Sequence, residues 1–330
     1  MLGRIAGRTE VYLAGVLIVL SVVLFILNPK FLTAENLFDV LRNNSFLGIV
    51  ALGELVVLVS GGIDVSFTAI ATVAQYVMGV IITKYMVESV FFAFLIPIPI
   101  GIALGAFNAF LVNRTRVHPV IITISNLNVF YGLLMVVSKG RWIYGFPGPF
   151  RDFARLKVLT LISEKGVDYG LSIFTVAWFF IAFATWVVLR YLPIGRKVYA
   201  LGGNSEAARR AGFDIFRIQL FVYCYIGFLS GIAGFVHAAL NQMIQPNAIV
   251  GRELDVLAAA ILGGASVFGG AGSPLGVVLG VLFIAFIKNG LILMKASAYW
   301  HQVIMGLIIV LAATLSAYQQ SLERKRRRWV

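Results

Sequence analysis

The stretch YALGGNSEAARRAGFDIFRIQLFVYCYIGFLSGIAGFVHAA, residues 199–239, joins a charged island to a long apolar run. The island is expected to form a short amphipathic helix that carries Glu206, Arg209 and Arg210. The apolar run is long enough to cross a bilayer, which takes about 20 residues of helix. A charged helix placed directly before a membrane span is suited to contact a partner outside the bilayer.

The composition places the whole chain among polytopic membrane proteins. Hydrophobic residues make up 60% of the 330 residues, charged residues make up 12%, and the mean hydropathy is +0.93, far outside the usage of soluble domains. The net charge of +13 comes from short basic clusters between apolar runs, a pattern that indicates membrane topology and argues against a nucleic-acid partner. The single cysteine, Cys224, lies in an apolar run, so we predict neither a disulfide framework nor a metal site.

We predict an all-α polytopic membrane protein with one transmembrane domain over residues 1–330 and about ten membrane spans. The first window follows Arg4 and Arg8 and has no cleavage motif behind it, so we expect a retained span and not a signal peptide. The ten windows are 10–27, 41–59, 66–82, 90–112, 119–137, 171–189, 218–240, 255–268, 274–292 and 300–318.

The basic residues predict the orientation of these spans. Ten spans put both termini on one side, and the enrichment of cytoplasmic connections in Lys and Arg makes that side the cytoplasm. The external loop 138–170 carries six further basic residues but also acidic ones, so it is weak evidence against this orientation. The basic tail 319–330 is expected to bind anionic headgroups. Fifteen of the 27 basic residues then lie inside: Arg4, Arg8, Arg114, Arg116, Arg190, Arg196, Lys197, Arg209, Arg210, Arg217, Arg324, Lys325, Arg326, Arg327 and Arg328.

The stretch SGGIDVS, residues 60–66, separates the second predicted span from the third. A polar stretch inside a membrane has to find partners for the backbone groups that leave the helix. Gly61 and Gly62 allow the chain to turn. Asp64 can accept hydrogen bonds from the freed amides, and Ser66 can cap the helix that restarts. A break within the bilayer and a tight cytoplasmic turn both fit this pattern.

Several polar residues stand within apolar windows, among them Glu54, Gln75, Asn108, Ser125, Asn126 and Asn128. An ionisable group such as Glu54 is costly there, so it faces the bundle interior or a cavity, as a functional residue or as a packing residue. Asn126 and Asn128 fit a hydrophilic pathway or interhelical hydrogen bonds. Residues i and i+2 point about 200° apart on a helix, so at most one of these two amides lines a given pathway.

Small residues recur at helical spacing and predict faces on which helices approach closely. A glycine-rich stretch, 263–273, predicts a second broken segment. It is not a phosphate-binding loop, because no Gly-Lys-Ser/Thr follows it, so the chain is not expected to bind ATP by that motif. The glycines on the predicted helix faces are Gly101, Gly105, Gly227, Gly231, Gly234, Gly276 and Gly280.

The residue types do not assemble a catalytic centre. His118, His237 and His301 are scattered over three segments, and no HExxH, cysteine pair or GxSxG occurs. Two transport architectures remain: an ion- or proton-coupled carrier that uses Glu54 and Asp64, with paired broken helices in inverted repeats, or a subunit that docks a separate motor. The two broken segments have dissimilar surroundings, which favours the motor-driven subunit. A non-transporting scaffold is a third possibility.

Four further stretches carry a resemblance to a known family. They are GGNSEAARRAGFDIFRIQ with YIGFLSGIAG, GRELDVLAAAILGGASVFGGAGSPLGVVLG, KNGLILM and YWHQVIMGLIIVLAA. They are similar to the permease subunit of ABC importers of the ribose/xylose/galactose class, in the branched-chain permease superfamily. SGGIDVSFT, residues 60–68, resembles the SGGIDLSVG signature of that family. The likeness runs from about residue 46 to residue 317 and is weaker at 138–170.

The resemblance implies a permease of the bacterial inner membrane that pairs with a second copy or a close paralogue. Cytoplasmic ABC ATPase subunits, which hold the ATP and magnesium, would drive it, while this chain would be no enzyme and bind no cofactor. A periplasmic or lipid-anchored binding protein would deliver a small neutral solute, most simply a monosaccharide. The implied mechanism is alternating access.

The motifs of the family assign site residues by position. The implied ATPase-coupling residues lie in the coupling segment, residues 195–217: Asn204, Glu206, Ala207, Ala208, Arg209 and Gly212. The predicted translocation path combines motif matches with the polar residues named above: Glu54, Gly61, Gly62, Asp64, Ser66, Asn126, Asn128 and Glu253. Four places depart from the usual pattern of the family: Glu54, Phe67, Thr68 and the run 125–128. The polarity of the pathway is where permeases for different solutes are expected to differ.

Overall fold

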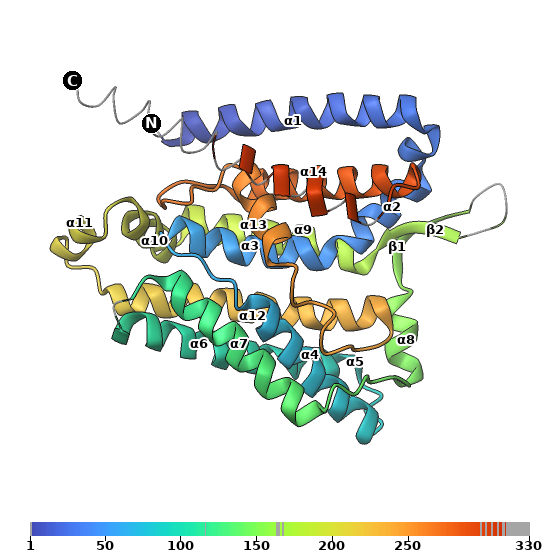
Figure 1. Cartoon of the computed structure of the whole chain (residues 1–330), viewed down its shortest axis with the longest axis horizontal. Coiled ribbons are helices and arrows are strands. Elements are labelled where there is room, and N and C mark those ends of the chain that lie inside the picture. Colours follow the sequence, from blue (N-terminus) through green and yellow to red (C-terminus); the bar gives the residue numbers. More distant parts are fainter. Residues whose placement is uncertain are drawn as a thin grey trace.

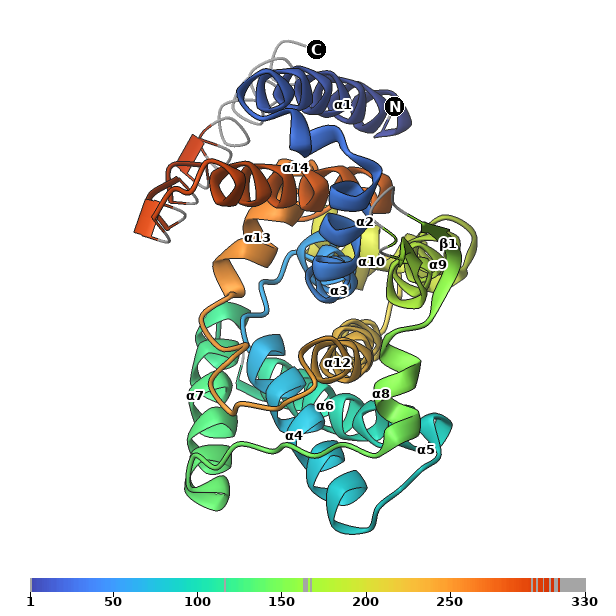
Figure 2. The same ribbon diagram turned by 90° about the vertical axis from the view of Figure 1, so that its right-hand side faces the viewer.

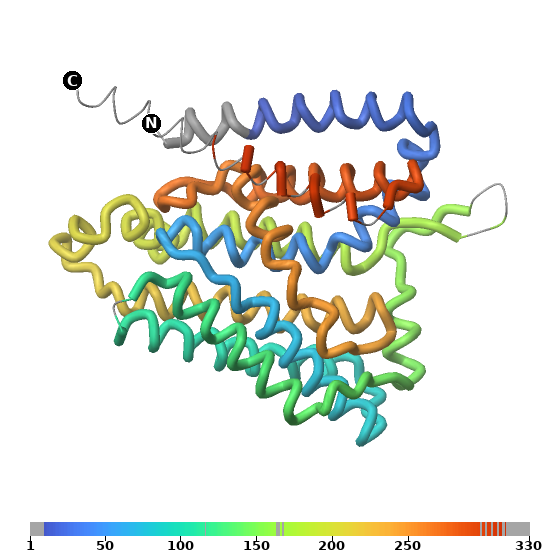
Figure 3. The backbone as a smooth tube through the Cα atoms, in the orientation of Figure 1, coloured from blue at the N-terminus to red at the C-terminus, as the bar shows by residue number. Residues whose placement is uncertain are grey.

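The chain folds into a bundle of helices that lie roughly along one long axis (Figures 1 and 3). This computed structural model describes residues 2–314 apart from 116, 163–165, 167, 298, 301, 305, 309 and 312–313, with side chains from residue 10 onward. The elements are α1 (Leu2–Leu27), the 3-10 turn η1 (Pro29–Leu32), α2 (Ala34–Asn43), α3 (Ser45–Val59), α4 (Phe67–Lys84), α5 (Val90–Leu95), α6 (Pro97–Thr115), α7 (Pro119–Ser138), α8 (Gly148–Ala154), β1 (Lys157–Ile162), β2 (Asp168–Ser172), α9 (Ile173–Tyr191), α10 (Pro193–Gly203), α11 (Ser205–Arg210), α12 (Ile215–Asn241), α13 (Glu253–Leu262) and α14 (Pro274–Leu293).

Helix α3 lies at the centre of the bundle because it is apolar on nearly every side. All of its residues are buried, and it contacts α9, α12, α13 and α14, which surround it in the end-on view (Figure 2). The indole ring of Trp178 from α9 lies directly against Gly48, where a Cβ atom would stand 2.1 Å from the ring. At Asn44 the chain bends by 50° between α2 and α3.

The glycine faces predicted from spacing bring helix pairs into backbone contact. A Cβ atom on Gly101 of α6 would stand 2.1 Å from the carbonyl oxygen of Gly227 in α12, and a Cβ on Gly227 would stand 2.2 Å from that of Gly101. Helices α13 and α14 meet in the same way, since a Cβ on Gly280 would lie 2.0 Å from the carbonyl oxygen of Ala259. The prediction that these glycines serve close helix packing is confirmed.

Seven helices in the described part are long and apolar enough to cross a membrane, or eight if the bent α2–α3 pair forms one span. They match eight of the ten predicted windows. The window 255–268 holds no span, because α13 has only 10 residues, about 15 Å of helix, before Gly263 and Gly264 turn the chain. The window 300–318 and the tail 319–330 fall partly or wholly outside the described residues. The number ten and the side of the termini therefore stay predictions.

The predicted external loop 138–170 has structure of its own. It contains α8 and the strand β1, which pairs with β2 in an antiparallel hairpin, a small strand element in an otherwise helical chain. Ile143 and Ile244 exchange two backbone hydrogen bonds of 3.0 Å and so tie the loop to the segment that follows α12. In Figure 1 α8 and the hairpin lie at the opposite end of the bundle from α10 and α11.

Candidate functional site

The coupling segment forms two short helices, α10 and α11, that meet at Asn204. The side chain of Asn204 accepts a hydrogen bond from the amide of Ala207 at 2.9 Å and so caps α11. Gly212 ends this helix with a φ of +81°, a backbone conformation that glycine adopts without steric cost, and its amide donates to the carbonyl of Arg209 at 3.0 Å. The expected charged helix exists, as the second of a pair and not as a single element.

Most of α11 is exposed to solvent. Glu206, Ala207 and Arg209 are exposed, and only Ala208 is buried against the bundle. Glu206 pairs with Arg210 at 2.5 Å, but the two side chains are 72% and 79% exposed, and a surface pair of this kind contributes little stability. Within the described part of the chain, the charges of α11 therefore serve no strong contact, and they are available to a partner.

The base of the coupling segment touches both broken segments through close backbone contacts between glycines. We name this contact the glycine junction. A Cβ atom on Gly202 of α10 would stand 1.9 Å from the carbonyl oxygen of Val59, and a Cβ on Gly269 would stand 2.6 Å from the carbonyl oxygen of Gly202. The glycines of the junction are Gly61, Gly202, Gly203, Gly269 and Gly270.

Two hydrogen bonds hold the glycine junction together. The amide of Gly270 donates to the carbonyl of Val59 at 2.9 Å and so joins the second broken segment to the end of α3. The hydroxyl of Tyr199 in α10 donates to the carbonyl of Gly272 at 2.7 Å. Because no side chain separates these three segments, a displacement of α10 acts directly on both breaks.

A buried polar network surrounds the first broken segment. Asp64 accepts hydrogen bonds from the amide and from the hydroxyl of Ser66, each at 2.7 Å. The amide group of Asn108 in α6 donates to the Ser66 hydroxyl at 2.7 Å, and that of Asn126 in α7 donates to Asn108 at 2.7 Å. Each of these side chains is at most 5% exposed. The network members are Glu54, Asp64, Ser66, Asn108, Thr123 and Asn126.

This network satisfies the backbone that leaves the helix at residues 60–66. The amide of Asp64 donates to Glu54 at 3.3 Å, and the amide of Val65 donates to the hydroxyl of Thr123 at 3.4 Å. The prediction that Asp64 accepts from freed amides is confirmed, whereas the predicted helix cap by Ser66 is wrong, because its hydroxyl donates to Asp64 instead. The second carboxyl oxygen of Glu54 has no hydrogen-bond partner among the described residues.

Besides Gly61 and Gly62, two of the predicted path residues lie outside this network. Asn128 points away from Asn126, as the helical spacing predicted; it is exposed and donates to the carbonyl of Ile124 at 2.9 Å. Glu253, at the start of α13, accepts hydrogen bonds from the hydroxyl of Thr68 and from the amide of Gly251. Thr68, one of the departures from the family pattern, thus joins the start of α4 to the start of α13.

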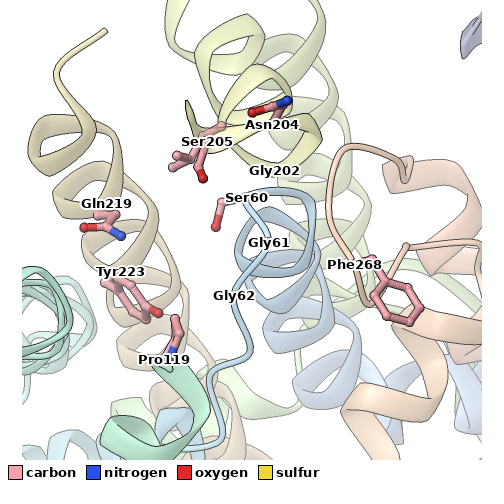
Figure 4. Close-up of a pocket in the computed structure, with 11 residues that line it drawn as sticks. Ser60, Gly61, Gly62, Pro119, Gly202, Asn204, Ser205, Gln219, Tyr223 and Phe268 are labelled. Atoms are coloured by element: carbon pink, nitrogen blue, oxygen red, sulfur yellow. The ribbon is translucent and has the colours of Figure 1, made fainter. Parts of the chain in front are cut away.

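A pocket of about 430 Å³ opens beside the glycine junction. We name it the coupling-end pocket. Figure 4 shows the hydroxyl of Tyr223 from α12 pointing toward the chain at Gly62, and Ser60 facing Ser205 across the pocket. Its walls come from the first broken segment, the start of α7, the α10–α11 junction, α12 and the second broken segment. The lining residues are Ser60, Gly61, Gly62, Pro119, Leu201, Gly202, Asn204, Ser205, Gln219, Tyr223 and Phe268.

The structure brings six of the eight predicted path residues to two neighbouring places. Gly61 and Gly62 line the pocket, while Glu54, Asp64, Ser66 and Asn126 lie in the buried network; Asn128 and Glu253 belong to neither. The residues that were not predicted from the sequence include Tyr223, Gln219 and Phe268 in the pocket and Thr123 in the network. These residues carry no motif, and helical periodicity shows which face of a helix is polar but not which segment meets it.

Comparison with known proteins agrees with this architecture. The family described as the permease component of branched-chain amino acid transport systems matches residues 36–313. The ribose import permease protein RbsC of Haemophilus influenzae is 31% identical over 96% of this chain and 95% of its own length. RbsC of Bacillus subtilis and the D-allose transport system permease protein AlsC of Escherichia coli are each 33% identical over 91% of this chain and 90% of their own length.

These relatives are transport components and not enzymes. No solved structure matches this chain to a significant level. The family match covers most of the bundle, including both broken segments and the coupling segment. The chain therefore belongs to the permease component family of the branched-chain amino acid transport systems and is a membrane-spanning subunit of an ABC importer.

Proposed function

We propose that this chain is the permease of an ATP-driven importer that carries a small neutral solute, most simply a monosaccharide, into a bacterial cell. The names of the relatives specify ribose, D-allose and autoinducer 2 as imported solutes. Ribose and D-allose are neutral polyhydroxylated molecules. The proposed setting is the bacterial inner membrane, with both termini and the coupling segment in the cytoplasm.

The contact between the coupling segment and both broken segments is the observation that carries this proposal. Helix α11 presents exposed charges to the outside of the bundle, which suits the docking surface for a cytoplasmic ABC ATPase. Its base, through Gly202, touches the ends of both breaks without side chains between them. A force applied to α11 by an ATPase that binds ATP and magnesium would therefore reach the backbone that interrupts the spans.

Alternating access follows from this arrangement. ATP binding would draw together the coupling segments of two permease copies, or of this chain and a paralogue, and the glycine junction would shift the broken segments. A central cavity would then exchange an external opening for a cytoplasmic one. A periplasmic or lipid-anchored binding protein would deliver the solute and hold most of the specificity, since the permease needs no charged group to pass a neutral molecule.

The alternative of an ion- or proton-coupled carrier assigns the coupling to Glu54 and Asp64. In the structure both carboxyl groups accept hydrogen bonds from the backbone of the first break, which supports a structural role. Uptake separates the two proposals, since an ATP-driven importer stops when ATP is depleted and continues when ion gradients are collapsed. The opposite pattern would reject the ABC assignment for this chain.

Docking of the ATPase on Glu206 has its own test. We expect Glu206→Arg to reduce both the co-purification of the ATPase and the uptake of D-ribose, because the exposed carboxylate faces the proposed partner. Asp39→Arg, at an exposed position of α2, is the matched control for charge reversal. Unchanged co-purification and uptake in the Glu206→Arg variant would remove Glu206 from the docking surface.

A further inference from the structure

We infer that the coupling-end pocket is a binding site for the transported polyhydroxylated solute, with Tyr223 as its specificity-determining hydrogen-bond donor. This inference rests on the proposed function and adds to it the place at which the solute is held before release. The sequence motifs place Gly61 and Gly62 on the translocation path, but neither the motifs nor the relatives assign a solute-binding site to this pocket. The size, the chemistry and the position of the pocket support the inference.

The size of the pocket fits a small solute. Its volume of about 430 Å³ lies in the range of small-molecule sites, roughly 300–1,000 Å³. A monosaccharide fits such a space together with a few water molecules. A large or polymeric ligand does not.

The lining chemistry suits a neutral molecule that is rich in hydroxyl groups. None of the lining residues, all of which belong to the described part of the chain, carries a charge. Ser60, Asn204, Ser205 and Gln219 offer neutral donors and acceptors. Phe268, which is 57% exposed, adds an aromatic face for the apolar side of a sugar ring. A charged solute would find no counter-charge on these walls.

Tyr223 is a buried polar residue of the pocket whose hydroxyl has no partner among the described residues. Its side chain is only 2% exposed. The hydroxyl lies against Gly62, where a Cβ atom would stand 3.2 Å from it. A buried phenol normally finds a hydrogen-bond partner, so the position indicates that the partner is a molecule that enters the pocket.

The walls of the pocket include the segments that ATP is proposed to move. Gly61 and Gly202 line the pocket and also belong to the glycine junction. A shift of α10 against the first broken segment changes the distance between two walls. The solute would therefore be gripped or released in step with the coupling segment, which places the site at the cytoplasmic exit.

The test measures whether D-ribose protects the pocket from a thiol reagent. The transporter is expressed with its ATPase and binding protein in a Cys224→Ser background, since Cys224 is the single cysteine. Ser205→Cys introduces a thiol that lines the pocket, and Arg114→Cys introduces one at the exposed end of α6, outside both the pocket and the coupling segment. Inside-out vesicles expose both thiols to a maleimide, and glycine betaine replaces D-ribose as an osmotic control without hydroxyl groups.

We expect D-ribose to slow labelling after Ser205→Cys by about tenfold at ten times its Kd, as mass action requires, and to leave labelling after Arg114→Cys unchanged. Adding Tyr223→Phe should weaken protection about 2- to 10-fold, the effect of one neutral hydrogen bond. The Tyr223→Phe variant should match the parent in melting temperature and in the amount of bound ATPase.

Four results would overturn the inference. Equal slowing at both thiols would show a general effect of the sugar, and blocking by the ATPase but not by D-ribose would show that the pocket is part of the ATPase dock. No protection in vesicles from cells that do take up D-ribose would reject the site and leave the proposed function standing. Absence of monosaccharide uptake by those cells would instead reject the proposed function and the site together.

Discussion

The two broken segments solve one physical problem in different ways. Both interrupt helices in a chain that crosses a membrane, where every freed backbone group needs a partner inside the protein. The segment at 60–66 finds its partners in side chains, mainly Asp64, Glu54 and Thr123. The segment at 263–273 finds them largely in backbone groups, such as the bond of 2.9 Å from the amide of Ser266 to the carbonyl of Ala271.

The difference shows in the residues that each segment uses. In the second segment Gly264, Gly269 and Gly270 have φ values of +85°, +87° and +74°, conformations that residues with a Cβ atom rarely adopt. The first segment has one such residue, Gly61, and relies on a buried network from three helices. The first segment should therefore be most sensitive to the loss of a hydrogen-bonding side chain. The second segment should be most sensitive to a Cβ atom added to one of its glycines. Four substitutions test this contrast.

The largest effect is expected where both segments meet the same residue. Gly202→Ala would place a Cβ atom 1.9 Å from the carbonyl oxygen of Val59, so the junction has to open. We expect uptake of D-ribose to fall by about tenfold or more, the factor that 1.4 kcal/mol in a conformational equilibrium gives. Gly203→Ala, where nothing lies within 4 Å of the added atom, is the control. Equal uptake in the two variants would mean that the junction transmits nothing.

The second segment should be sensitive to backbone changes. Gly269→Ala combines a positive φ with a Cβ atom 2.6 Å from the carbonyl oxygen of Gly202, and we expect a loss of about 2–4 kcal/mol in stability from strain and overpacking. Gly251→Ala has a positive φ of +101° but no atom within 4 Å, so it measures the strain alone. Thermal unfolding in detergent compares them, and identical melting temperatures would show that the contact with α10 adds nothing.

The first segment should be sensitive to side-chain chemistry. Asp64→Ala leaves the amide and hydroxyl of Ser66 without their acceptor in a buried place, and we expect a loss of about 1–3 kcal/mol. Asp64→Asn keeps one acceptor oxygen and should retain most of the melting temperature. Asp39→Ala, at an exposed position, controls for the loss of a carboxylate. If Asp64→Ala melts like the parent, the network does not hold the break.

The smallest effect is expected at Glu54. Glu54→Gln keeps the oxygen that accepts from the amide of Asp64 and changes only the oxygen that lacks a partner in the described chain. We expect uptake and stability to stay close to those of the parent, with a change in stability of about 1 kcal/mol or less, the net contribution of one hydrogen bond. Loss of uptake with normal stability would revive the ion-coupled alternative, in which this carboxyl group carries the proton.

The sequence predicted a large part of the fold. Gly101 and Gly227 were recognised from their spacing, because close packing of helices requires small residues on one face. Both breaks were located, since polar and glycine-rich stretches cannot continue a membrane helix. The prediction of a membrane span at 255–268 is wrong, because apolar residues continue beyond the turn at Gly263 and Gly264. Hydropathy averaged over a window does not detect a change in chain direction.

The site was predicted less completely. Glu54, Asp64 and Asn126 were identified because polar residues stand out in apolar runs. Their partners could not be assigned, since Asn108 reaches Ser66 across 42 residues and Asn126 reaches Asn108 across 18 residues. Tyr223 gave no signal, because an aromatic residue in an apolar span looks like ordinary packing until its hydroxyl is seen beside a pocket.

The sequence alone determined three features: the charged island at 199–212, the two breaks and the membrane class. Each depends on the hydropathy and charge of residues that are near one another in the chain. The tertiary structure decided that these pieces touch. The backbones of Gly61, Gly202 and Gly269 meet at the base of α10. These glycines lie far apart in the sequence and have no side chain whose type could indicate a contact. Contact between backbones depends on how the helices pack, and packing is a property of the whole bundle.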